Sequence, residues 1–196
     1  MRQCLFGYGS FSQGQVHFGP FANLIVSEKP AFVKGEMYRL ASGYPVLDLD
    51  HPGEVIEGRL LELEAVESFW AIMDTLLGVD AKTSPFVRTE VQAMTDNYSK
   101  MDAQVYCLNW NRKPKGLKKI PKGDWQKNMA METPFVDQLE TRHRDYLLKL
   151  SKSRGREIVP IQLDLYRELL SMELIVDKGR RLALTPLGKE ASLFLQ

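Results

Sequence analysis

A loop of small residues near the start of the chain is the first place where chemistry could occur. It follows a short apolar segment and reads Leu5-Phe6-Gly7-Tyr8-Gly9-Ser10-Phe11. Backbone N–H groups in such a turn can point together at an anion. The loop lacks the third glycine of a dinucleotide-binding fingerprint, because Ser12 stands there, and it lacks the Gly-Lys-Ser/Thr of a phosphate loop. Tyr8, two residues before Ser10, also excludes a nucleophile elbow. The loop is therefore either an anion cradle or only a tight turn.

Other titratable residues add few candidates. Arg88 and Glu90 fall on one face of an expected strand, where an ion pair is favoured over a catalytic role. The three histidines and two cysteines are far apart in sequence and show no metal-ligand spacing. We therefore expect neither a metal site nor a cofactor.

One basic segment, residues 112–127, contains seven Lys/Arg against a single Asp, and Trp110 and Trp125 flank or interrupt it. Such a segment could bind phosphate or a nucleic-acid backbone. Residues 1–100 carry 8 Lys/Arg and 13 Asp/Glu, so the segment could instead neutralise an acidic neighbour. The second interpretation is favoured, and a nucleic-acid partner is disfavoured.

The composition is that of an ordinary globular protein, with 44% hydrophobic and 26% charged residues in 196 and a formal net charge of +1. The first 27 residues hold too many glycines and polar side chains for a membrane span or a signal peptide. The chain has only two cysteines, which favours a reduced, cytoplasmic setting.

The elements that must position the loop are mostly strands in the first two thirds of the chain. Short apolar or alternating runs predict strands at 3–8, 31–40, 44–49, 55–63, 86–94 and 103–109. Between them, apolar residues from Val66 to Leu77 recur at helical spacing, and Gly78 supplies a stop. After residue 134 the pattern predicts helices within 135–150 and 161–172, a hairpin at 174–184, and a last helix that begins at Thr185-Pro186.

Several of these segments together resemble one family, the γ-glutamylcyclotransferase-like (AIG2-like) proteins. The Tyr-Gly-Ser run at 8–10 resembles the family's Tyr-Gly-Ser-Leu signature. Further similarities follow in the family's order at 33–40, 43–45, 55–60, 72–78, 105–107 and 123–125. The resemblance covers roughly residues 3–125. It implies an α+β fold, with a small mixed β-barrel of about five to seven strands, flanking helices, and a cavity at the loop.

The resemblance also implies a reaction, in which the α-amine of a γ-glutamyl group attacks its own side-chain carbonyl and releases 5-oxoproline. A glutamate moves the proton, and loop amides hold the substrate carboxylate or the developing oxyanion. In this chain the aligned position is Leu77, which cannot move a proton, and Phe86 replaces a family tyrosine. Asp80 is the candidate substitute carboxylate, because Asp74 matches a family aspartate that the resemblance implies is not the acid/base group. The implied pocket lining is Tyr8, Gly9, Ser10, Phe11, Leu77 and Tyr106.

The carboxy-terminal part has a weaker resemblance, to the last helix and wing of a truncated winged helix. The would-be recognition helix carries Asp164, Glu168 and Glu173 against Arg167, so it would repel phosphate. Packing on the barrel or a protein contact is therefore favoured. We expect two domains, a barrel over 1–128 that includes the basic segment and a helical extension over 129–196.

Three functions remain open from the sequence. The first is a non-catalytic or diverged barrel that binds a small anionic ligand or a peptide end in the loop pocket. The second is an active γ-glutamylcyclotransferase with a relocated carboxylate. The third is a module that binds a protein or a nucleic acid through 112–127 and the extension.

Overall fold

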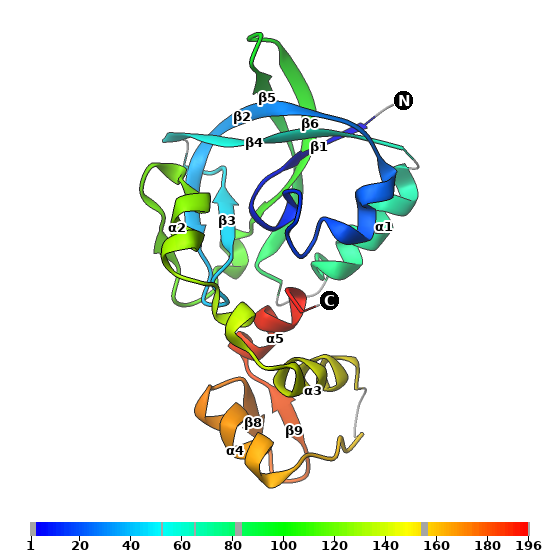
Figure 1. Cartoon of the computed structure of the whole chain (residues 1–196), viewed down its shortest axis with the longest axis vertical. Coiled ribbons are helices and arrows are strands. Elements are labelled where there is room, and N and C mark those ends of the chain that lie inside the picture. Colours follow the sequence, from blue (N-terminus) through cyan, green and yellow to red (C-terminus); the bar gives the residue numbers. More distant parts are fainter. Residues whose placement is uncertain (1–2, 52, 65, 81–83, 154–156, 196) are drawn as a thin grey trace.

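A computed structural model describes residues 3–51, 53–64, 66–80, 84–153 and 157–195. In Figure 1 a curved sheet forms the upper part of the molecule, and a smaller helical part lies below it. The sheet strands are β1 (Gln3–Gly7), β2 (Ile25–Arg39), β3 (Pro45–Asp48), β4 (Glu54–Leu63), β5 (Phe86–Thr95), β6 (Lys100–Leu108) and β7 (Lys118–Lys119). The helices are α1 (Val66–Leu76), α2 (Trp125–Met131), α3 (Thr141–Lys152), α4 (Leu163–Ser171) and α5 (Pro186–Leu193), and β8 (Ile175–Asp177) with β9 (Leu182–Leu184) forms a hairpin.

Five strands close into a barrel, which confirms the expected α+β class. The strand order is β2-β4-β1-β6-β5, and a β2–β5 pairing closes the ring. The short strands β3 and β7 pair with the C-terminal end of β2. The β1–β6 pairing is parallel, whereas the other pairings are antiparallel. The closing pairings are short: β2 pairs with β5 through Ala31 and Phe32, and β1 pairs with β6 at Leu5.

Successive side chains of β1 serve two different cores, because neighbouring residues of a strand point to opposite faces. Phe6 faces the barrel interior with Ile56 and other apolar residues. Leu5 faces the second and larger core, which includes Phe69 of α1 and Leu147 of α3. This larger core runs without a break from the barrel wall into residues beyond 128.

Gly58 of β4 allows β1 to lie close to this strand. A Cβ at position 58 would lie 2.5 Å from Phe6 Cζ and 2.7 Å from the Gly7 carbonyl oxygen. Any larger residue would push the two strands apart. Close approach explains the glycine in the 55–60 motif without any catalytic role.

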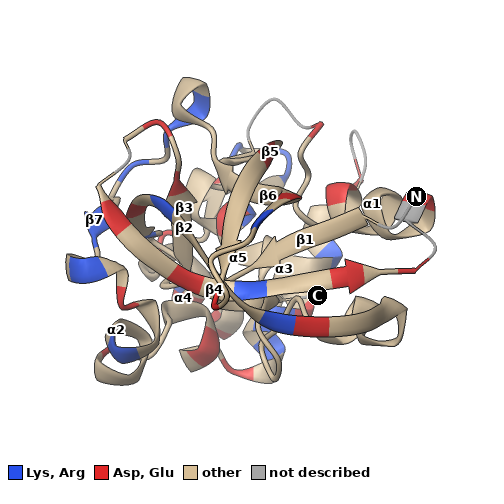
Figure 2. Cartoon of the chain, turned by 90° about the horizontal axis from the view of Figure 1, so that it is seen from above, with Lys and Arg blue, Asp and Glu red and all other residues tan. Residues whose placement is uncertain are grey.

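The basic segment is more structured than expected, since it contains β7 and the start of α2. Lys119 Nζ lies 2.6 Å from Glu36 Oε1, and Lys113 Nζ lies 4.3 Å from the centroid of the Trp110 ring. Figure 2 shows basic and acidic positions interspersed around β2, β4 and α2 instead of gathered on separate faces. Part of the positive charge is therefore paired with the acidic barrel.

The carboxy-terminal part contains the expected hairpin and last helix, while the helix expected within 135–150 is a short turn at Phe135–Gln138 followed by α3. The acidic residues of α4 are engaged by α3. Arg142 lies 3.0 Å from Asp164 and 2.9 Å from Glu168, and His143 Nε2 lies 2.8 Å from Glu168. These pairs join α3 to α4, so the acidic face of α4 is part of the folded unit.

Candidate functional site

The loop after β1 is a single turn of 3₁₀ helix over Gly9–Phe11. Gly9 has φ +52°, a backbone conformation that favours glycine. A Cβ there would also lie 2.6 Å from Pro45 Cγ, so the space around it favours glycine as well. The N–H groups of Phe11 and Ser12 donate to the carbonyls of Tyr8 and Gly9. These two N–H groups already have acceptors within the loop, so fewer donors remain to bind an anion than the sequence suggested.

Tyr8 is a buried cross-link between strands. Its hydroxyl donates to the Tyr106 carbonyl oxygen at 2.7 Å and accepts from the Leu47 N–H at 3.0 Å. Burial raises the pKa of Tyr8 far above its ordinary value, so the hydroxyl stays protonated. The side chain therefore joins β1 to β3 and β6.

Tyr106 belongs to a network of polar side chains with Asp74 and Arg88. Its hydroxyl donates to Asp74 Oδ1 at 2.8 Å, and Arg88 Nη2 lies 3.2 Å from Asp74 Oδ2. The Arg88 guanidinium also stacks over the Trp70 ring at 4.8 Å. Arg88 thus pairs with Asp74 and not with Glu90, its neighbour on the strand. Burial, and then the bond to Asp74, raise the pKa of Tyr106.

Leu77 lies directly after α1, and its side chain is 0% exposed. Its N–H donates to the Met73 carbonyl, and its own carbonyl accepts from Ser84 Oγ at 2.8 Å. The side chain belongs to the larger apolar core, as its position in the helical stripe predicts. Asp80 is exposed at the end of the following turn.

A histidine that sequence reasoning left without a role joins the loop to the far end of the chain. His17 Nδ1 lies 2.9 Å from Ser10 Oγ, and Nε2 lies 2.8 Å from the Leu193 carbonyl oxygen. Burial lowers the pKa of His17 to about 4, so the ring is neutral near pH 7. Because a carbonyl can only accept, Nε2–H donates to Leu193, and the Ser10 hydroxyl donates to Nδ1.

Helix α5 and the residue after it dock against the same region, and Figure 1 shows α5 between the barrel and the helical part below. The Phe194 ring stacks on Tyr44 with centroids 4.5 Å apart and an interplanar angle of 2°, and it lies 6.3 Å from Phe86 and 5.1 Å from His17. Glu190, one turn earlier, is buried and accepts from the Ser42 N–H at 2.6 Å. Burial raises the pKa of Glu190, and the bond from Ser42 opposes that rise.

The loop residues of the implied lining lie beside Tyr106, through the Tyr8 hydroxyl and the Phe11 ring, whose centroid is 5.6 Å from that of Tyr106. Leu77 belongs to the same large apolar core as Phe11 and Tyr106. All six residues of the implied lining are buried. His17, Tyr44, Glu190 and Phe194 join this region. Tyr44 lies in the 43–45 motif, whereas no motif in the sequence pointed to the other three. Among the described residues, no group of three or more His, Cys, Asp or Glu could hold a metal ion. No helix in the described parts of the chain is long and apolar enough to cross a membrane.

Comparison with known proteins decides the family. The family model described as "Gamma-glutamyl cyclotransferase, AIG2-like" matches residues 5–127. The chain belongs to this family. Among curated proteins, none matches the sequence.

The solved structures similar to this AIG2-like chain have low sequence identity to it. The solution structure of a protein from Arabidopsis thaliana is 19% identical in sequence, with a TM-score of 0.50. The match covers 83% of this chain and 94% of that one. An AIG2-like protein from Mus musculus is 18% identical with a TM-score of 0.49, over 62% and 87% of the two chains. YkqA from Bacillus subtilis is 20% identical with a TM-score of 0.48, over 67% of this chain but only 42% of its own length.

Proposed function

We propose that this AIG2-like chain does not release 5-oxoproline and that its loop region binds a peptide end or a small anionic ligand instead. The observation that supports the proposal is Leu77. The family resemblance aligns this residue with the catalytic glutamate, and its side chain is wholly buried among apolar residues. Loss of a general acid/base costs on the order of 10²–10⁴ in rate. An apolar wall also disfavours the charged amine of a γ-glutamyl substrate.

Two of the carboxylates that could replace the missing glutamate, Asp74 and Glu190, already have partners. Asp74 accepts from the Tyr106 hydroxyl and pairs with Arg88. Glu190 accepts from the backbone of Ser42. Asp80, the substitute that the sequence suggested, is exposed to solvent. None of these three has the arrangement of a buried, unpaired acid aimed at the loop.

The docking of α5 favours a peptide as the ligand. His17 already donates to a main-chain carbonyl, that of Leu193, and Tyr44 already stacks on an aromatic side chain, that of Phe194. These are the two contacts with which a protein site recognises a peptide segment: a backbone hydrogen bond and an apolar anchor. A ligand that uses them must displace the last turn of α5.

The test is an assay of 5-oxoproline release from γ-glutamyl dipeptides. We expect no turnover by the natural chain or by Leu77→Gln, which has a polar but non-titrating side chain. Leu77→Glu restores a carboxylate, and turnover by this variant alone would support the alignment. Turnover by the natural chain at an ordinary enzyme rate, on the order of 1–10³ s⁻¹, would overturn the proposal. If that turnover vanished in Asp80→Asn, Asp80 would be the relocated acid.

A further inference from the structure

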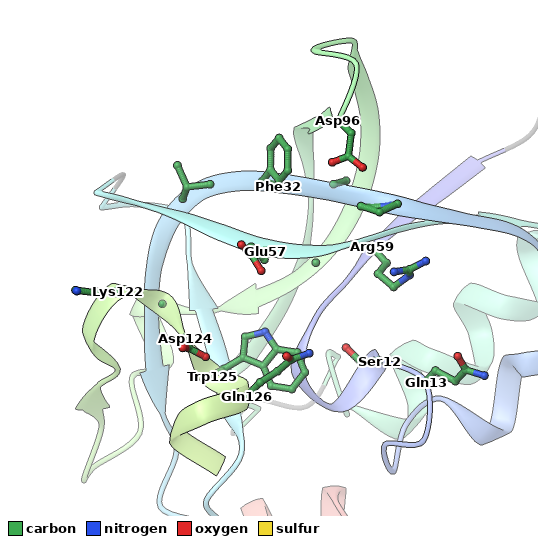
Figure 3. Close-up of a pocket in the computed structure, with 15 residues that line it drawn as sticks. Ser12, Gln13, Phe32, Glu57, Arg59, Asp96, Lys122, Asp124, Trp125 and Gln126 are labelled. Carbon is green, nitrogen blue, oxygen red and sulfur yellow. The ribbon is translucent and has the colours of Figure 1, made fainter. Parts of the chain in front are cut away.

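A hollow lies on the outer face of the barrel, beside Ser12 and Gln13, which follow the buried loop. It is bordered by strands β2 and β4, by the residues that follow the loop, and by the start of α2, and its volume is about 770 Å³. Figure 3 shows its lining drawn from these separate segments, with side chains of both charges among them. This volume is within the range of about 300–1,000 Å³ that small-molecule sites have. We call this hollow the β4 groove.

One end of the β4 groove is rich in hydrogen-bond donors. Arg59 of β4 is opposite Pro30 of β2, and one of its terminal nitrogens pairs with Glu28 at 3.1 Å. The Nε of Arg59 is buried and has no partner among the described residues. Ser12 and Gln13 line the groove as well, and Figure 3 shows both near Arg59. A carboxylate is the group that a guanidinium with neighbouring hydroxyl and amide donors recognises best.

The other end carries two acids, Glu57 and Asp124, and also Lys122, whose amine points away from both acids in Figure 3. Glu57 lies two residues before Arg59 and therefore on the same face of β4, and it is exposed. Figure 3 shows Glu57 above the Trp125 indole, with Asp124 beside the ring. Two carboxylates together favour an ammonium group, because each can accept hydrogen bonds from its N–H donors. Asp124 Oδ1 already accepts from the Lys127 N–H at 3.0 Å, so Glu57 is the freer of the two acids.

The two ends together define the ligand. Asp96 also lines the groove, above Arg59 in Figure 3. Glu57, Asp124 and Asp96 would repel a phosphate or another simple anion, while Arg59 would repel a simple cation. Because the positive and negative groups project from one strand face, a ligand with both charges matches the groove. We propose that the β4 groove binds a zwitterionic amino acid or short peptide. Its carboxylate lies at Arg59 and its ammonium group at Glu57.

The full-length chain allows a direct test, because its three tryptophans give separate indole N–H signals in NMR spectra. The probe is the dipeptide Gly-Leu in three forms: uncapped, N-acetylated, and amidated at its carboxyl end. We expect the uncapped form to shift the Trp125 signal, which Trp125→Phe identifies by its disappearance. Each cap removes one charge and should weaken binding roughly tenfold or more. Trp70, whose ring centroid is 6.3 Å from that of Tyr106, reports on the loop region instead.

Charge-removing variants assign each end of the groove. Arg59→Gln should bind the uncapped and amidated dipeptides equally, and Glu57→Gln should bind the uncapped and acetylated forms equally. Arg167→Gln and Glu67→Gln remove exposed charges elsewhere and should keep the wild-type preferences. No Trp125 shift with uncapped dipeptide up to about 10 mM would overturn the proposal. Equal binding of all three forms, or a shift confined to Trp70, would overturn it too, and none of these results depends on Leu77.

Discussion

Replacement of Phe194 by alanine tests whether α5 is firmly docked on the barrel. The Phe194 side chain is 2% exposed and packs between barrel and loop residues, with its ring parallel to that of Tyr44 at 4.5 Å. No other residue at the end of α5 places an aromatic ring against both Tyr44 and Phe86. If the docking is stable, removal of this ring must lower the free energy of unfolding of the whole chain.

The expected loss follows from burial and ring contact. Phe→Ala substitutions in packed cores cost roughly 3–5 kcal/mol, since transfer free energy is lost and a cavity remains. Stacked aromatic pairs contribute about 0.5–1.5 kcal/mol beyond buried area, and that amount is contained in the total. For a chain of this size, 1 kcal/mol corresponds to roughly 2–4 °C. The midpoint of thermal unfolding should therefore fall by roughly 6–20 °C.

Urea unfolding of the full-length chain measures the loss in free energy of unfolding directly. Phe194→Leu keeps most of the apolar volume and should cost clearly less than Phe194→Ala. Met131→Ala is the matched control, because Met131 is 78% exposed and its loss should change stability by no more than about 0.5 kcal/mol. If Phe194→Ala cost as little as Met131→Ala, α5 would not be docked in solution, and the peptide-like contacts at His17 would lose their support.

Three further perturbations test other parts of the site. Burial lowers the pKa of His17 from 6.5 to about 4, so the unfolded chain binds the extra proton in this pH range. Stability should therefore fall as pH falls from 6.5 to 4, and His17→Gln should flatten that dependence in urea unfolding at several pH values. Gly43→Ala, at φ +101° and with its Cβ 2.4 Å from Pro134 Cα, should cost more than about 1 kcal/mol in thermal unfolding. Tyr106→Phe leaves Asp74 without its hydroxyl donor and should cost roughly 1–3 kcal/mol in urea unfolding. An unchanged pH profile or unchanged stabilities would contradict these assignments.

Helices whose apolar residues recur at helical spacing were predictable from the sequence. Strand segments that form only because they pair with a distant strand were not. The stripe from Val66 to Leu77 predicted α1, and Thr185 caps α5 as expected, with its side chain accepting from the Gly188 N–H. The first half of β2, from Ile25 to Pro30, is mostly exposed and has no alternation. It is a strand because β4 supplies its hydrogen-bonding partner, and this information is absent from any local pattern.

The site was predictable to the extent that family motifs marked it. Ordered similarities pointed to Tyr8, Tyr106 and Leu77, and the structure places them in adjoining cores. The partners that complete the region lie far away in sequence, as His17 and Leu193 do, 176 positions apart. Such a contact depends on how two packed units meet, and no spacing rule anticipates it.

A family motif can persist for folding reasons alone. The Tyr8 hydroxyl ties three strands together, and Gly9 fits where any larger residue would strike Pro45. The Ser10 hydroxyl is engaged by His17. Each of these residues would be needed in this fold even if no substrate were ever bound. The Tyr-Gly-Ser motif therefore indicates the barrel, and the evidence for or against the reaction has to come from the acid/base position.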